Sequence, residues 1–127
     1  MLGKENMMNK TVFRIYALIV CFVCLCGVLI NLGTAVYDGF RVVRPGFTLS
    51  SSTWERHQSD EAYTKNWSKN KPKPEGEELT KLRESSWDRE RLVEKRKGAQ
   101  SMVKSTIYVV IFSIVFLVHR TGAKKEK

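Results

Sequence analysis

The chain has 127 residues, a formal net charge of +9 and three cysteines. The basic residues are spread over both tails and a central segment that also carries acids, which does not predict nucleic-acid binding. The cysteines all fall within one apolar run, which excludes a disulfide framework. Cys21 and Cys24 have C-x-x-C spacing, but a redox or metal site requires thiolates near water or positive charge. We therefore expect packing residues there.

A charge-free run of 22 residues, 15–36, follows a basic tail at 1–14. At 1.5 Å per residue it covers about 33 Å, enough to cross a hydrocarbon core of roughly 30 Å. A cleaved signal peptide is the alternative, but its apolar core is normally about 7–15 residues long. The small residues Asn31, Gly33 and Ala35 match a cleavage site poorly. The run therefore predicts a retained transmembrane helix.

One face of this helix repeats small or polar residues every three or four positions, which favours close approach of another helix. The predicted packing face consists of Ala17, Cys21, Cys24, Gly27, Asn31, Ala35 and Gly39. We expect the Asn31 amide to form a hydrogen bond across this contact. Leu18, Phe22, Leu25 and Leu29 lie on a different face and are suited to lipid.

A polar extramembrane segment, 37–101, follows, with 14 basic and 11 acidic residues between positions 38 and 101. Ser52 and Glu55 fit a capping box, which predicts a short helix over about 53–67. The linker 68–76 contains K-N-K-P-K-P. A long helix is predicted from about 77 into the membrane, since no proline interrupts it. A segment this small rarely supports its own core, so we expect its helices to lie on the membrane or a partner.

The second transmembrane helix is predicted at 102–119, followed by a basic tail at 120–127. Lys104 lies within its first turn and can extend its ammonium to the headgroups. Aromatic and basic residues near the ends of spans commonly sit at the headgroup level. The predicted interfacial anchors are Tyr37, Trp54, Tyr63, Trp67, Lys104, His119 and Arg120. A basic patch comprises Arg89, Arg91, Lys95, Arg96 and Lys97.

Further motifs are weak. His57, Asp60 and Glu61 have helical spacing but make a poor metal site, and a solvated helix face is the simpler interpretation. Residues 66–68 form a glycosylation sequon, and residues 124–127 resemble a dilysine retrieval tail. Both signals are short and apply only in a eukaryotic cell. The sequence predicts no catalytic, cofactor-binding or metal-binding residue.

Together these features predict an all-α integral membrane protein, a two-span transmembrane helical hairpin with a long charged, partly helical connecting segment. The predicted function is that of a small non-catalytic accessory, structural or regulatory subunit of a larger membrane complex. Its partners would be membrane lipid and other membrane subunits, or copies of itself, with no nucleic acid and no small-molecule substrate. One alternative is a homo-oligomeric channel with Asn31, Thr34 and Ser113 around its lumen. Another is a membrane-anchored module that binds anionic lipid or a soluble partner through residues 89–97.

The sequence determines the orientation of the spans and the type of membrane only in part. Equal numbers of basic residues flank the spans on the two sides. The first-synthesised flank has three basic residues against two at the start of the central segment. We therefore expect both termini in the cytoplasm. A bacterial inner membrane and an endoplasmic-reticulum-type membrane both fit.

Overall fold

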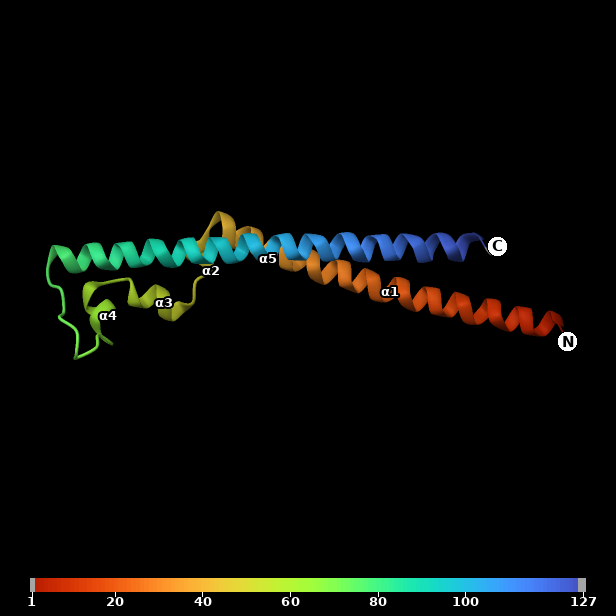
Figure 1. The fold of residues 1–127 in the computed structure, drawn as a ribbon, viewed down its shortest axis with the longest axis horizontal. Coiled ribbons are helices and arrows are strands. Elements are labelled where there is room, and N and C mark those ends of the chain that lie inside the picture. Colours follow the sequence, from red (N-terminus) through yellow and green to blue (C-terminus); the bar gives the residue numbers. More distant parts are fainter. Residues whose placement is uncertain (1, 126–127) are drawn as a thin grey trace. The chain divides into compact units, whose positions relative to one another are not determined.

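The computed structural model describes residues 2–125 and is helical throughout its regular parts (Figure 1). The helices are α1 (Leu2–Val43), α2 (Pro45–Thr48), α3 (Ser51–Arg56), α4 (Asp60–Thr64) and α5 (Glu77–Lys125). Helix makes up 85% of the structure, and no strand occurs among the described residues. Two helices are long and apolar enough to cross a membrane, over Met7–Val43 and Glu77–Gly122. The all-α prediction is therefore confirmed.

Both long helices extend beyond the apolar runs that identify them in the sequence. Helix α1 continues from Val36 to Val43 and ends before Pro45. Proline disfavours the helical conformation in the residue before it, and Arg44 accordingly has φ −133° and ψ 67°. Helix α5 begins directly after Gly76, whose φ of +62° is readily adopted only by glycine. Its first turn contains Glu77 and Glu78, which complement the helix dipole.

The single helix predicted over 53–67 is replaced by two shorter ones, α3 and α4. The Ser50 hydroxyl caps α3 by accepting a hydrogen bond from the Thr53 amide at 3.3 Å. The Ser59 hydroxyl caps α4 in the same way, from the Ala62 amide at 3.1 Å. A second N-cap inside the predicted helix divides it, because the cap residue has extended backbone angles. The predicted capping box was therefore placed two residues too late.

The described residues form two compact units. The apolar unit contains 2–36 of α1 and 102–125 of α5, and the polar unit contains 37–101. Within the apolar unit, the rings of Tyr16 and His119 lie 5.9 Å apart. Ala17 and Cys24 are buried, whereas the four residues predicted to face lipid are exposed. The two helices of this unit therefore contact each other along one side of α1.

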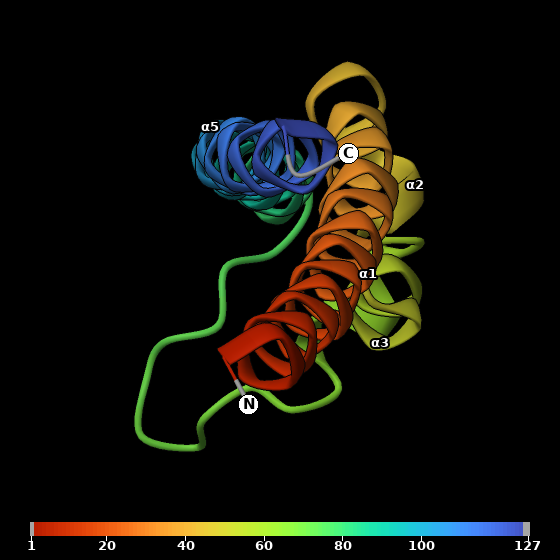
Figure 2. The same ribbon diagram turned by 90° about the vertical axis from the view of Figure 1, so that its right-hand side faces the viewer.

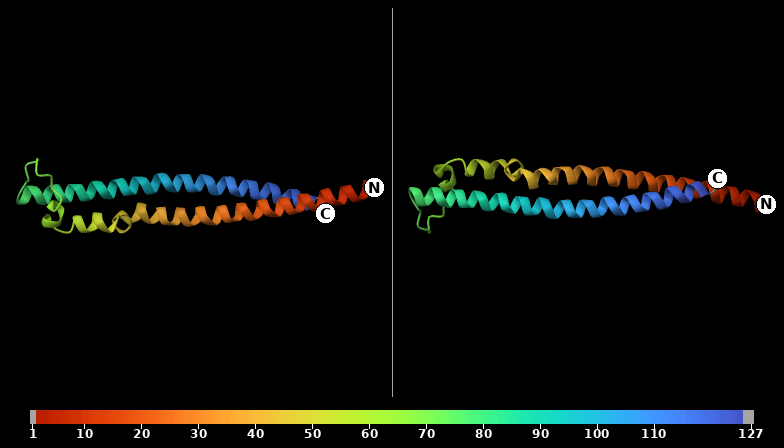
Figure 3. Two further views of the ribbon diagram at one scale, coloured as in Figure 1. Left: turned by 90° about the horizontal axis from the view of Figure 1, so that it is seen from below. Right: turned by 90° about the horizontal axis from the view of Figure 1, so that it is seen from above.

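Within the polar unit, α3 and α4 lie beside the first turns of α5 (Figures 1 and 3). The segment that joins α4 to α5 has little regular structure and runs as an open loop (Figure 2). Leu79 of α5 is buried in this unit, and so is His57, which follows α3. The sequence predicts that the short helices α3 and α4 lie on the membrane or on a partner. In the structure these helices pack against α5. Hydrogen bonds and aromatic rings form the contact, because the segment has few aliphatic residues to form a core.

Candidate functional site

A network of charged side chains joins α1 to α5 in the polar unit. Arg41 donates hydrogen bonds from Nε and Nη2 to the two Glu94 carboxylate oxygens, at 2.8 and 3.3 Å. Its Nη1 donates to Asp38 Oδ1 at 3.1 Å. The Thr48 hydroxyl donates to Glu94 Oε1 at 3.1 Å. The single guanidinium is thus shared between two carboxylates, as its planar fork of donors allows.

This network is shielded from solvent. The Asp38 side chain is 2% exposed and that of Arg41 is 19% exposed. The hydrogen bond with Glu94 is the largest cause that raises the pKa of Arg41, and the same bond lowers the pKa of Glu94. Both shifts favour the charged forms. Among the described atoms, Asp38 Oδ2 is buried without a hydrogen-bond partner. The network is a structural clamp whose carboxylates together exceed its cation by one charge.

Gly98 permits the close approach of the helices at this level. A Cβ atom built on Gly98 would lie 2.6 Å from Arg41 Cβ and 3.1 Å from the Asp38 carbonyl oxygen. Only a residue without a side chain fits there. Packing therefore requires glycine at this position, although glycine in a helix costs about 1 kcal/mol relative to alanine.

A buried histidine organises the other end of the polar unit. His57 Nδ1 lies 2.7 Å from the Thr53 carbonyl oxygen, and Nε2 lies 3.1 Å from the Ser86 hydroxyl. Because a carbonyl oxygen only accepts, Nδ1 donates to Thr53, and Nε2 shares a second hydrogen bond with the Ser86 hydroxyl. The rings of Tyr63 and Trp87 lie 5.5 and 5.3 Å from the imidazole. The prediction of a solvated face is therefore wrong for His57, which is a core residue.

A second ion pair holds α4 against α5. Asp60 accepts hydrogen bonds from Arg83 Nε and the Thr80 hydroxyl, both at 2.8 Å. Arg83 also donates to the His57 carbonyl oxygen at 2.7 Å. The hydrogen bond from Arg83 is the main cause that lowers the pKa of Asp60, followed by the one from Thr80. Asp60 thus connects two elements of the polar unit, and no group of three metal-ligating residues occurs among those searched.

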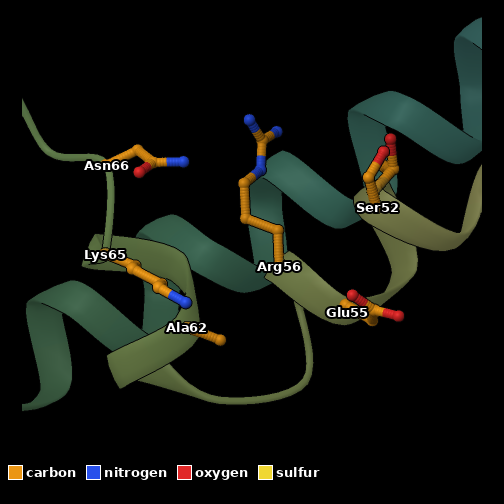
Figure 4. A pocket seen from close by; sticks show the side chains of 7 residues that line it. Ser52, Glu55, Arg56, Ala62, Lys65 and Asn66 are labelled. Carbon is orange, nitrogen blue, oxygen red and sulfur yellow. The ribbon is translucent and has the colours of Figure 1, made fainter.

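An open pocket of about 400 Å³ lies beside α3 and α4 (Figure 4). Its lining residues are Ser52, Thr53, Glu55, Arg56, Ala62, Lys65 and Asn66. Arg56 contacts Glu90 at 3.8 Å, and its guanidinium lies 5.9 Å from the centre of the Tyr63 ring. The lining mixes acid, base and hydroxyl groups, and Glu55 and Lys65 are exposed. This pocket is a solvated recess between two short helices.

A smaller pocket of about 250 Å³ is predominantly aromatic. Tyr37, Phe40, Phe47 and Thr48 line it. We call it the aromatic pocket. Phe47 is 85% exposed, although α2 buries its first residue, Pro45. A phenylalanine this exposed on a charged unit is unusual, because burying its ring contributes about 1.5–3 kcal/mol.

The predicted packing face lies partly against α5. A Cβ atom built on Gly27 would lie 2.8 Å from the Phe112 ring, so this glycine contacts the second apolar helix directly. Asn31 does not reach across, however. Its amide donates to the Gly27 carbonyl oxygen of the same helix at 2.8 Å, which is a correction to the expected interhelical bond. Cys21 and Ala35 are half-buried on the same side, and Gly39 has no neighbouring atom within 4 Å of a built Cβ.

The predicted interfacial anchors fall into two groups. Tyr63 and Trp67 belong to the aromatic core of the polar unit, where their rings lie 6.4 Å apart. Half-buried His119 contacts the Tyr16 ring and bonds to the Val115 carbonyl oxygen. The other four predicted anchors are exposed, namely Tyr37, Trp54, Lys104 and Arg120. Sequence patterns did not reveal Trp87 or Ser86, because no local signal marks a residue that packs on a distant histidine.

The channel alternative receives no support from its three proposed lining residues. The Thr34 hydroxyl donates to the Ile30 carbonyl oxygen, and the Ser113 hydroxyl donates to that of Val109. Asn31 likewise bonds within its own helix. These polar groups are satisfied inside an apolar helix and do not require a water-filled lumen.

Comparison with known proteins gives no relative. No family model, no curated protein and no solved structure matches the chain.

Proposed function

We propose that this chain is a small two-pass integral membrane protein that serves as a non-catalytic subunit of a larger membrane complex. The observation that carries this proposal is the aromatic pocket of the polar unit. The packing face of α1 supports it less, because α5 already contacts Gly27. Subunit interfaces are enriched in aromatic residues at their centres, and Phe47 is nearly fully exposed. The partner would be a membrane protein that inserts an apolar side chain between Phe40 and Phe47.

A non-catalytic role agrees with the use of the polar groups that the structure describes. Arg41, Asp38 and Glu94 bind one another, and both ring nitrogens of His57 have hydrogen-bond partners. Asp60 is similarly engaged by Arg83 and Thr80. These groups stabilise the polar unit, and their geometry suits that role better than proton transfer to a substrate.

The test is purification of the tagged full-length protein from its native host in mild detergent, followed by identification of the proteins that accompany it. Phe47→Ala should release the partner subunit. Val93→Ala is the matched control, because Val93 is an exposed apolar residue of the same unit outside the aromatic pocket. A wild-type protein that purifies as a lone monomer would overturn the proposal. If both variants retain the partner, the aromatic pocket is not part of the interface.

We further propose that both termini lie in the cytoplasm. The test is cysteine labelling at Asn6 and Ser51 after replacement of the three native cysteines. An impermeant reagent applied to intact cells should label Ser51→Cys, because residue 51 is exposed and belongs to the segment that connects the two apolar helices in the sequence. Labelling of Asn6→Cys alone would reverse the orientation.

A further inference from the structure

A groove in the polar unit combines apolar walls with basic residues. It has a volume of about 250 Å³ and lies where the end of α1 and the start of α2 meet α5. The walls are Val42, Val43, Pro45 and Leu92, and the charged residues at its rim are Asp88, Arg91 and Lys95. We call it the basic groove.

The walls of the basic groove are unusually exposed for aliphatic side chains. Val43 is 77% exposed and Leu92 is 67% exposed, in a segment that is otherwise rich in charge. Val43 follows the charge-free run of α1 by seven residues, or about 10 Å of helix. The headgroup layer extends about 5–8 Å beyond each side of the hydrocarbon core. Because about 10 Å slightly exceeds that layer, Val43 of a spanning α1 lies at the outer edge of the headgroups, close to the lipid phosphates, and a lipid bound there would extend an acyl chain toward it.

The charge around the groove is positive after internal pairing. Glu94 is bound by Arg41, and Glu90 lies 3.8 Å from Arg56. Asp88 lies 4.0 Å from Arg91, at the outer limit of an ion pair between two partly exposed side chains. Among the residues that the structure describes, no ion pair engages Lys95. The two basic residues at the rim of the basic groove therefore exceed its one acid by one charge, and the Lys95 ammonium is available to a ligand.

We propose that the basic groove binds one anionic phospholipid. Arg91 and Lys95 are four residues apart on α5, which places their side chains side by side on one face. Together they would hold the lipid phosphate, while an acyl chain lies against Val43 and Leu92. A soluble phosphate would bind the two cations but would make no use of the apolar walls. An acidic peptide would not need the apolar walls either. This inference does not depend on the proposed partner subunit.

The experiment uses full-length protein, stripped of lipid in nonionic detergent and then offered equal amounts of phosphatidylglycerol and phosphatidylcholine. Native mass spectrometry counts the lipid molecules that remain bound. We expect one phosphatidylglycerol per chain and little phosphatidylcholine. Each cation near a membrane surface contributes about fivefold in affinity for anionic lipid, so the double variant Arg91→Gln/Lys95→Gln should bind about 30-fold more weakly. Far-UV circular dichroism of each variant verifies that the helices are intact.

The matched control is Arg89→Gln/Arg96→Gln, which removes the same charge from exposed positions on α5 outside the groove. It should retain binding within about threefold. Equal loss in both double variants would show diffuse attraction and overturn the proposal. Leu92→Gln should lower the affinity for phosphatidylglycerol. Excess glycerol phosphate should not displace the bound lipid. Displacement by glycerol phosphate, with no effect of Leu92→Gln, would identify a soluble anion as the ligand instead. No preference for phosphatidylglycerol in the wild type would also overturn the lipid site.

Discussion

Replacement of Gly98 by alanine tests the close contact of α1 and α5 in the polar unit. The added Cβ would lie 2.6 Å from Arg41 Cβ and 3.1 Å from the Asp38 carbonyl oxygen, whereas ordinary contact begins near 3.4 Å. The helices must therefore separate by roughly 0.8 Å at this level. Neither neighbouring atom can rotate away, because one is a backbone oxygen and the other is attached directly to the backbone.

Two opposing terms set the size of the effect. Alanine favours the helix over glycine by about 1 kcal/mol. Overpacking in a tight contact typically costs about 1–3 kcal/mol, and separation would also lengthen the 2.8 Å bond between Arg41 and Glu94. We expect Gly98→Ala to lower the free energy of unfolding by about 1–2 kcal/mol. Gly39→Ala is the matched control, because nothing lies within 4 Å of its built Cβ, and it should raise stability by up to about 1 kcal/mol.

The assay is urea unfolding in nonionic detergent, followed by tryptophan fluorescence. The chain has three tryptophans, and Trp54, Trp67 and Trp87 all belong to the polar unit, so the signal reports that unit. The two glycine variants should shift the midpoint in opposite directions at an unchanged slope. If Gly98→Ala stabilises the unit as much as Gly39→Ala does, the helices do not approach this closely and the argument fails.

Three further predictions concern the apolar helices and the charged network. Gly27→Ala should weaken the contact with the Phe112 ring by about 1 kcal/mol, because the ring can turn partly aside, whereas Gly33→Ala, with no neighbour within 4 Å, should not. Labelling of the buried thiol of Cys24 at rising SDS fractions measures this, with the other two cysteines replaced. Arg41→Gln should cost about 2–4 kcal/mol in urea unfolding, because it leaves shielded carboxylates without their cation. The lowered pKa of Glu94 means that its stabilising effect is complete above the ordinary value of 4.5 and is lost as pH falls through the lowered value. Glu94→Gln should flatten this part of the acid-unfolding curve, and an unchanged curve would contradict the assignment.

The two apolar helices were predictable because their signal is local. A run of 22 residues without charge identifies an apolar helix by length alone, and the absence of proline after residue 74 indicates an unbroken α5. The glycine at position 27 also stood out, since small residues at helical spacing mark close approach. These inferences need only neighbours in the sequence.

The polar unit was less predictable because its contacts join distant residues. The sequence shows Arg41 and Glu94 as separate charges 53 positions apart, and only the fold brings them together. His57 appeared to belong to a solvated face, but Ser86 and two aromatic rings enclose it. The position of the helix break was also missed, since several serines compete as caps over 50–59 and their local preferences are nearly equal.

The position of charge on α1 explains why its apolar run and its structural end differ. Counted along the sequence, the run stops before Asp38, the first acid after it. In the structure Asp38 and Arg41 are directed toward α5, where Arg41 also binds Glu94. The exposed side of the same turns carries Tyr37, Phe40 and Val43 instead. One side of α1 therefore remains compatible with an apolar environment up to its last residue. This is the side from which both proposed contacts of the polar unit begin, the aromatic pocket at Phe40 and the basic groove at Val43.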